Sequence, residues 1–136
     1  MGREYLIDTI SYMIYNKKYQ VKFYRDSRTG KSPVYDYIQC LDKKHRAKIY
    51  KYIYYLRDCE GYLDEPLSRH VVGKIRELRV DFSNNHYRIF YFIFVEKKII
   101  FLHAYLKRTE KAPEREINIG LNNYYDVINN FGIYDE

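Results

Sequence analysis

At 136 residues, with 46% hydrophobic and 31% charged residues, the chain has the length and composition of one globular domain and not of a disordered segment. Its formal net charge of +6 favours an anionic partner, which could be nucleic acid, an acidic protein or anionic lipid. No apolar run approaches the roughly 18 residues that a membrane span needs, and Cys40 and Cys59 form neither a C-x-x-C pair nor a zinc pattern. We therefore expect a cytoplasmic protein with reduced, buried thiols.

The first half of the chain predicts an extension, a strand and two helices. Residues 1–18 are expected to form an N-terminal extension, and residues 19–136 a single domain. Residues 19–26 alternate well enough for a strand, and the turn sequence SRTGKS follows. A Ser-Pro pair then starts a short helix with an apolar stripe over residues 33–41. A second amphipathic helix is expected over residues 43–60, with a glycine after its end.

The second half predicts an antiparallel meander and a last helix. After a loop at residues 61–73, strands are expected at residues 74–82, 86–96 and 99–107, because β-branched and aromatic residues dominate and the connections are hairpin-short. Pro113 and the acidic residues after it open the last helix. Its expected buried stripe is Ile117, Leu121, Tyr124, Ile128 and Phe131. The predicted fold class is α+β: a small, mainly antiparallel twisted sheet with two N-terminal helices on one face and a C-terminal helix.

Side chains of a strand alternate between its two faces, which allows the three predicted strands to be compared face by face. In the last strand the apolar face would comprise Ile100, Leu102, Ala104 and Leu106. If the apolar faces pack on the helices, the opposite face carries Arg79, His86, Arg88, His103, Tyr105 and Lys107, with Arg108 in the turn beyond. We expect only Glu77 to offset this charge within the strands. Such a density of like charge predicts a groove that binds an anion.

The residue types in this groove favour phosphate chemistry without a metal or other cofactor. No Asp/Glu/His cluster suggests a divalent metal, and no glycine-rich phosphate loop is present. Arg can grip phosphate oxygens bidentately, Lys adds a point charge, and RNA supplies its own nucleophile in the 2′-OH. A His or Tyr side chain could move the protons. Structural readings stay open for single residues: Arg79 could pair with Glu77, and His86 could be a turn residue.

Three segments carry a family resemblance. The series IRELRV, YRIFYF and FLHAYLKRTEKAPEREI resembles the HigB-like, phage-associated branch of the RelE/ParE superfamily, the toxins of type II toxin–antitoxin systems. The opening FYRDSRTGKSPVYDYI also fits the start of these toxins. The similarity covers roughly residues 19–119. Its most specific part is the K-R-T-x-K-x-P run, in which the family's second Thr is Ala112 here.

The resemblance implies an mRNA endoribonuclease that works on the ribosome and generates a 2′,3′-cyclic phosphate by attack of the 2′-OH. It implies mRNA, the ribosome and a small helix-turn-helix (HigA-like) antitoxin as partners, and no cofactor. The residues carried over as catalytic are Arg79, Arg88, Lys107, Arg108 and His103. Those expected to contact RNA are Lys74, Arg76, His86, Tyr105 and Lys111. Because the acid/base residue differs between branches of the family, His86, His103 and Tyr105 stay unranked.

Two other functions remain open at this point. One is inhibition of DNA gyrase, as in ParE-like toxins, which needs binding and no nuclease chemistry. The other is a non-enzymatic module whose basic face docks an acidic protein. For the nuclease, the substitution Arg88→Ala is expected to remove toxicity and keep the fold.

Overall fold

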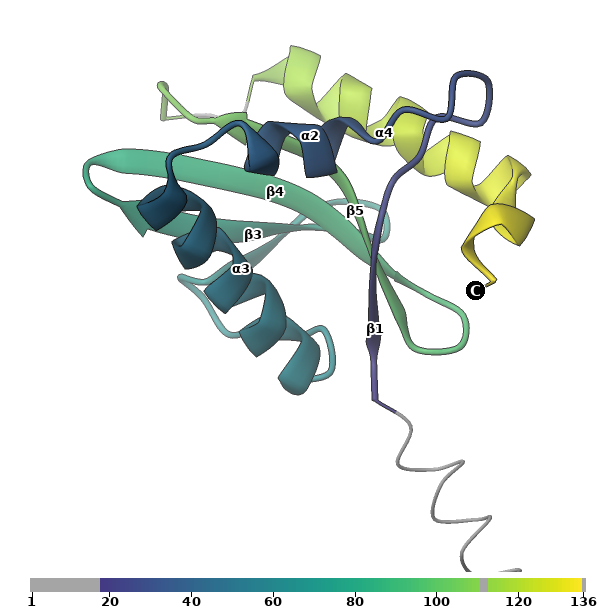
Figure 1. Cartoon of the computed structure of the whole chain (residues 1–136), viewed down its shortest axis with the longest axis horizontal. Coiled ribbons are helices and arrows are strands. Elements are labelled where there is room, and N and C mark those ends of the chain that lie inside the picture. The colour runs from purple at the N-terminus through teal and green to yellow at the C-terminus, as the bar shows by residue number, and fades with distance from the viewer. Residues whose placement is uncertain (1–17, 111–112, 136) are drawn as a thin grey trace, which may run out of the picture.

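The computed structural model describes residues 18–110 and 113–135, which form a five-stranded sheet covered by helices on both faces (Figure 1). In chain order the elements are β1 (Gln20–Phe23), α2 (Pro33–Gln39), α3 (Lys43–Asp58), β2 (Ser68–Val72), β3 (Ile75–Phe82), β4 (Asn85–Phe94), β5 (Lys98–Leu106), α4 (Glu114–Asn129) and the 3₁₀ turn η1 (Phe131–Tyr134). The strand order is β1-β5-β4-β3-β2. β1 runs parallel to β5, and the other neighbours are antiparallel. The predicted α+β class is confirmed.

The helices α2 and α3 cover one face of the sheet, as their apolar stripes predict (Figure 1). The apolar stripe of α3 includes Ile49, Ile53 and Leu56, which are fully inaccessible to solvent. They pack on the inward side chains of β3, β4 and β5, which include Leu78 and Ile89. Burial of this stripe, at about 1.5–3 kcal/mol for each large aliphatic side chain, fixes α3 on the sheet.

The other face of the sheet is covered by α4, and this departs from the expected open groove. A second core cluster joins Phe90 and Phe92 of β4 to Val127 of α4. The predicted helix stripe holds for Ile117, Leu121 and Tyr124, which pack against this cluster. It differs further on, because Val127 is buried while Ile128 and Phe131 are 37% and 55% exposed. Only the end of this face that α4 leaves uncovered can form a groove.

A β-bulge resets the side-chain alternation of β5. Phe90 pairs with His103, whereas Tyr91 pairs with Phe101, so Leu102 has no partner in the ladder. An unpaired residue shifts every later side chain to the other face. Leu102 consequently packs with the α4 cluster and Ala104 with the α2–α3 cluster. The prediction that Ile100, Leu102, Ala104 and Leu106 share one face is therefore wrong.

Two of the differences from the expected strands concern segments that were predicted to connect them. β2 lies in the segment predicted as a loop, where its five residues carry mixed polar and apolar side chains without clear alternation. The turn between β4 and β5 uses Glu96 and Lys97, both with positive φ, so Lys98 already belongs to β5.

The thiols are also less buried than predicted: Cys40 is exposed and Cys59 is half-buried.

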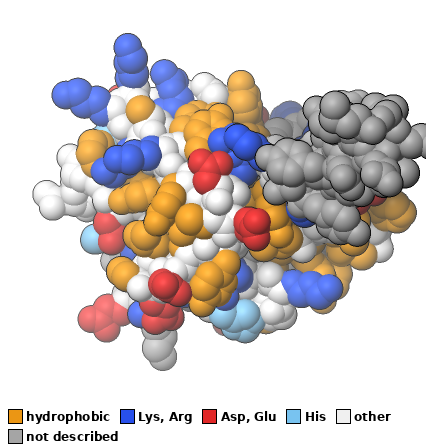
Figure 2. All heavy atoms as spheres, turned by 90° about the horizontal axis from the view of Figure 1, so that it is seen from below, with side chains coloured by type: hydrophobic (Ala, Val, Ile, Leu, Met, Phe, Trp, Pro, Cys, Tyr) orange, Lys and Arg blue, Asp and Glu red, His pale blue; other side chains and the backbone are white. Residues whose placement is uncertain are grey.

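Many of the tyrosines lie on the surface. The large hydrophobic side chains that stay exposed include Tyr35, Tyr54, Tyr55, Tyr62 and Tyr125. Hydrophobic side chains are accordingly visible between charged ones on the face of the molecule in Figure 2. A tyrosine ring can pack partly against protein while its hydroxyl contacts water.

Within the described residues, no helix is both long and apolar enough to cross a membrane.

Candidate functional site

A hollow of about 400 Å³ opens where β3, β4 and β5 reach the same end of the sheet. The side chains around it are Arg79, Asp81, His86, Arg88, Lys107, Arg108, Thr109 and Glu110. Strand pairing brings them together, because Arg79 lies opposite Arg88 and the Lys107 amide donates to the His86 carbonyl at 2.8 Å. Five of the predicted site residues thus meet in one place, which we call the basic hollow.

Arg88 is held between two carboxylates of β3. Its Nε lies 3.2 Å from Glu77 Oε1, and its Nη1 donates to Asp81 Oδ1 at 2.8 Å. The Nε contact is an ion pair without hydrogen-bond alignment, since both of its atoms lack a hydrogen-bond partner within the described residues. Only 4% of the Arg88 side chain is exposed. The two carboxylates offset the repulsion between Arg88 and Arg79, which lie directly opposite each other. Like charges in this arrangement would otherwise be destabilising.

Asp81 joins Arg88 to His86. Its Oδ1 also lies 3.0 Å from His86 Nδ1, and the two residues are cross-strand partners. Burial alone would raise the pKa of Asp81, but hydrogen bonds from Arg88 and His86, together with their charges, outweigh burial and lower the pKa below its usual 3.8. The carboxylate therefore stays ionised and orients the imidazole at the rim, where 55% of the His86 side chain is exposed.

Three cations of the basic hollow lack such compensation. Within residues 18–110 and 113–135, Arg79, Lys107 and Arg108 form no ion pair with a carboxylate. Among the described residues, the Arg79 guanidinium donates only to the Pro66 carbonyl, at 3.5 Å. Arg79 and Lys107 are half-buried and Arg108 is exposed. Positive charge with free donors, set around a concave surface, suits a phosphate group.

His103 and Tyr105 lie beside the basic hollow and do not line it. His103 Nε2 contacts Glu116 of α4, and its ring stacks on Tyr105 with centroids 5.8 Å apart. Burial, reinforced by the charges of Glu77 and Glu116, raises the pKa of Tyr105 to about 12. Its hydroxyl therefore keeps its proton at neutral pH. His103, one of the residues predicted to be catalytic, is therefore paired with Glu116 of α4.

Two of the residues expected to contact RNA lie elsewhere. Lys74 is exposed in the turn before β3, at the end opposite Asp81. Arg76 donates to Ser68 Oγ at 3.1 Å and stacks over the Tyr62 ring, 5.1 Å from its centroid. Neither lines the basic hollow. Lys111 falls outside the described residues.

Sequence reasoning missed the part that carboxylates play. Asp81 received no role, although the hairpin turn that fixes its partner can be read from the sequence. Ser83 and Asn84 form a two-residue turn with φ of 52° and 64°, and a turn of this length puts Asp81 opposite His86 and Arg79 opposite Arg88. No local signal pointed to Glu116, which reaches His103 only because α4 folds back over the sheet.

The basic hollow is built from cations, one histidine and two lining carboxylates. Among the described residues, no group of three His, Cys, Asp or Glu side chains is arranged to hold a metal ion. The arrangement can neutralise a phosphodiester with Arg79, Lys107 and Arg108, and can present His86 to an exchangeable proton.

Comparison with known proteins places this site within a family. A search of curated proteins found no match. Residues 36–125, well over half of the chain, match the family model described as phage derived protein Gp49-like (DUF891). The matched segment contains every residue around the basic hollow. The chain therefore belongs to the Gp49-like family of phage-derived proteins, a toxin family of the RelE/HigB type.

Proposed function

We propose that this protein is an mRNA endoribonuclease, the toxin of a toxin–antitoxin pair of the HigB kind, and that it acts in the cytoplasm on mRNA held by the ribosome. The observation that carries the proposal is the convergence of Arg79, Lys107 and Arg108, without carboxylate partners among the described residues, around a hollow that also presents His86. Membership in a toxin family makes an antitoxin the expected partner. A helix-turn-helix antitoxin of the HigA kind is the specific proposal.

The proposed reaction is an internal transesterification of RNA. The 2′-oxygen forms a bond to phosphorus while the bond from phosphorus to the 5′-oxygen breaks, which yields a 2′,3′-cyclic phosphate and a 5′-hydroxyl end. The proton of the 2′-OH goes to a base, and a proton is returned to the 5′-oxygen. The three cations would stabilise the extra negative charge of the pentacovalent transition state.

His86 is the best-placed side chain for the proton transfers. It lies at the rim of the hollow, and Asp81 fixes its ring through Nδ1 and leaves Nε2 for the substrate. The other two candidates are less suited to proton transfer. His103 is hydrogen-bonded to Glu116, and the raised pKa of Tyr105 keeps its hydroxyl protonated at neutral pH. Arg88 would act as a positioning residue, because the two carboxylates that hold it leave it little charge for phosphate.

Induction in cells tests the proposal. Expression of the wild-type chain should arrest growth and create new mRNA 5′ ends, whereas Lys107→Ala/Arg108→Ala should do neither at equal protein level. Lys31→Ala, a substitution at an exposed lysine away from the hollow, is the matched control. Purified gyrase is assayed for supercoiling in parallel.

Three results would contradict the nuclease. Inhibition of gyrase without new mRNA ends would indicate a ParE-like inhibitor. Unchanged growth with the protein folded and abundant would indicate a binding module. New ends produced equally by the double variant would remove the basic hollow from the mechanism.

A further inference from the structure

β1 leaves one side of its backbone open at the edge of the sheet. It is the first strand in the order and, among residues 18–110 and 113–135, it pairs only with β5. The amides of Gln20 and Tyr24 donate to β5, to the carbonyls of Lys97 and Phe101 at 2.8 Å each. In a parallel pair, successive residues direct their amide and carbonyl groups to opposite sides. The backbone groups of the alternate residues, Val21 and Phe23, therefore point away from the sheet.

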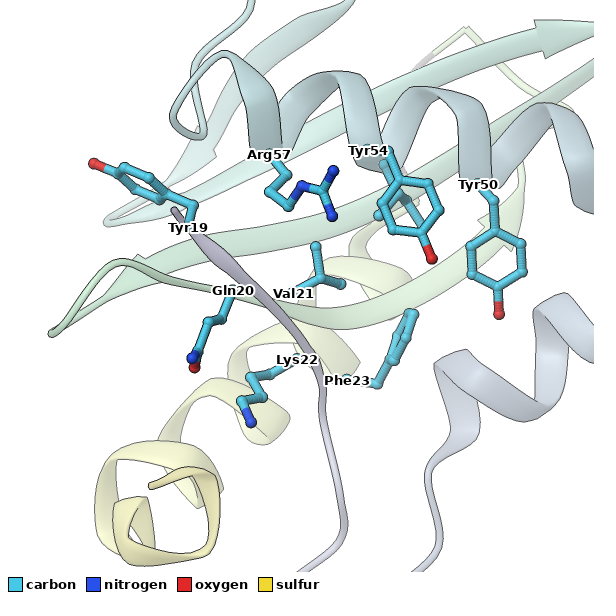
Figure 3. A pocket seen from close by; sticks show the side chains of 9 residues that line it. Tyr19, Gln20, Val21, Lys22, Phe23, Tyr50, Tyr54 and Arg57 are labelled. Atoms are coloured by element: carbon cyan, nitrogen blue, oxygen red, sulfur yellow. The ribbon is translucent and has the colours of Figure 1, made fainter. Parts of the chain in front are cut away.

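A hollow of about 420 Å³ lies along β1 on the side of α3. Tyr50, Tyr54 and Arg57 reach from α3 toward the strand, and Val21 and Phe23 face them from β1 (Figure 3). Tyr50 and Tyr54 stack with centroids 6.0 Å apart, and Arg57 lies 4.8 Å over the Tyr54 ring. The walls of this hollow are therefore mainly aromatic and aliphatic, and its cations are Lys22 and Arg57.

A second hollow, of about 340 Å³, lies along the same strand and involves η1. It shares Val21, Lys22 and Phe23 with the first and adds side chains that include Arg25, Tyr35 and Ile133. Figure 3 shows Lys22 pointing to the opposite side of β1 from Val21. The amide of Arg25 donates to Tyr134 Oη at 2.9 Å, which closes the edge just after β1. The open edge is thus short and bounded.

Hollows on both sides of an open strand edge fit the side chains of one more strand. An added strand would hydrogen-bond to the backbone of Val21 and Phe23 and would direct alternate side chains into the two hollows. RNA has no backbone that could continue the ladder. The edge therefore favours an extended polypeptide over a nucleic acid.

The charges around the two hollows specify what kind of peptide would bind. Among the described residues that line them, Lys22, Arg25 and Arg57 are cations, and none is a carboxylate. Arg57 has an exposed ion pair with Asp58 at 3.2 Å, which is worth at most about 1 kcal/mol and can be exchanged. A second copy of this chain would bring like charges together, so the complement is an acidic partner.

We propose that the open edge of β1 docks an extended, acidic segment of a partner protein, which adds a sixth strand to the sheet. Apolar side chains of that segment would fill the two hollows, and its carboxylates would face Lys22, Arg25 and Arg57. β1 precedes the residues matched by the family model, which start at 36, so the docking edge is a feature of this chain outside that match. The proposal does not rest on the cleavage reaction.

Selection from a library of random 12-residue peptides on the immobilised full chain tests the proposal. Enriched peptides should alternate apolar residues with others and carry Asp or Glu. Their affinity, measured by fluorescence anisotropy, should fall about tenfold or more with Val21→Pro, because proline removes an amide that faces the open edge and spares the bonds to β5. Arg57→Glu should weaken binding similarly, whereas Lys51→Glu, at an exposed position on α3, should not.

A test from the peptide side covers the case in which Val21→Pro fails to fold. N-methylation of alternate peptide amides should abolish binding in one register and leave it unchanged in the other, as a ladder requires. The proposal is overturned if no peptide is enriched, or if the enriched peptides bind Val21→Pro as tightly as wild type. It is also overturned if single-stranded RNA displaces them, or if sedimentation shows a dimer that Val21→Pro dissociates.

Discussion

At the scale of single residues, the two carboxylates around Arg88 decide how the charge of the site can be used. An arginine that is 4% exposed and paired with both Glu77 and Asp81 contributes little net positive charge to a ligand. It instead fixes the ends of β3 and β4 relative to each other. The charge available to a phosphate group comes from Arg79, Lys107 and Arg108, which line the basic hollow together with Arg88.

Arg88→Ala should lower the free energy of unfolding by about 3–5 kcal/mol, because it leaves the buried Glu77 carboxylate without its partner. This changes the expectation that Arg88→Ala keeps the fold. Urea denaturation followed by circular dichroism measures the effect, with Arg79→Ala as the matched control, expected to change stability by less than about 1 kcal/mol. An Arg88→Ala protein that unfolds at the wild-type urea concentration would show that the pair is not structural.

Asp81→Asn should reduce stability at neutral pH and not in strong acid. The folded-state pKa of Asp81 is lowered, so its stabilising effect is complete above the unfolded-state value of about 3.9 and is lost as pH falls through the folded-state value. Because 59% of the side chain is exposed, solvent screening limits the effect to roughly 1 kcal/mol. Denaturation curves of both proteins at pH 7 and pH 2 should differ at pH 7 and converge at pH 2. An equal difference at both values would contradict the assignment.

At the scale of secondary-structure elements, α4 determines which part of the sheet face stays open. It covers the face with Val127 packed near Phe92, and its Glu116 engages His103. Gly120 lets the helix approach closely: a Cβ atom there would lie 2.8 Å from Phe90 Cδ2, and that ring is fully buried. The position of α4 thus depends on the absence of one methyl group.

Gly120→Ala should destabilise the protein by about 1–3 kcal/mol, because overpacking against Phe90 outweighs the roughly 1 kcal/mol that alanine gains over glycine in a helix. Asn122→Ala, at an exposed position of the same helix, is the matched control and should be neutral or slightly stabilising. Thermal unfolding of the two variants decides the sign. A higher melting temperature for Gly120→Ala would mean that α4 does not lie against Phe90 as described.

The same elements show how far the sequence could be used to predict the structure. The period of the apolar residues predicted α2, α3 and the three long strands, since the pattern is local and each element buries its own stripe. The pattern failed at Leu102, because the bulge there is a feature of the pairing between β5 and β4 and not of one strand alone. It also failed at β2, which is a strand because it pairs with β3 and not because its residues alternate. The cations of the basic hollow were predictable from alternation, because Arg79 and Arg88 pair in register and Lys107 lies beyond the bulge. The pairing of His103 with Glu116 was not, because it depends on a long-range contact with α4.

At the scale of the whole molecule, two distinct surfaces bring cations together. The basic hollow lies at the end of β3, β4 and β5, and the open edge of β1 lies beyond β5 on the outer side of the sheet. The first combines cations with a histidine, and the second combines cations with aromatic walls. The proposed RNA site and the proposed docking edge are therefore separate surfaces.

The affinity for RNA should fall steeply as the salt concentration rises. The cations of the basic hollow should account for a measurable part of this salt dependence. Each phosphate contact on single-stranded RNA contributes about −0.7 to the slope of log affinity against log salt concentration. Substitution of Arg79, Lys107 and Arg108 by Ala should therefore reduce the slope by about 2. A triple variant at the exposed residues Lys31, Lys43 and Lys44 is the matched control. A slope that is the same in the hollow variant and in wild type would show that RNA binds elsewhere.

The most direct measurement is cleavage of a defined mRNA by the purified protein in the presence of ribosomes, with the chemistry of the new ends determined. The account predicts 2′,3′-cyclic phosphate and 5′-hydroxyl ends, a rate reduced by at least about a hundredfold in the variant lacking Arg79, Lys107 and Arg108, and a wild-type rate for Lys31→Ala. Cleavage that leaves 3′-hydroxyl ends, or that proceeds equally fast in the triple variant, would contradict it.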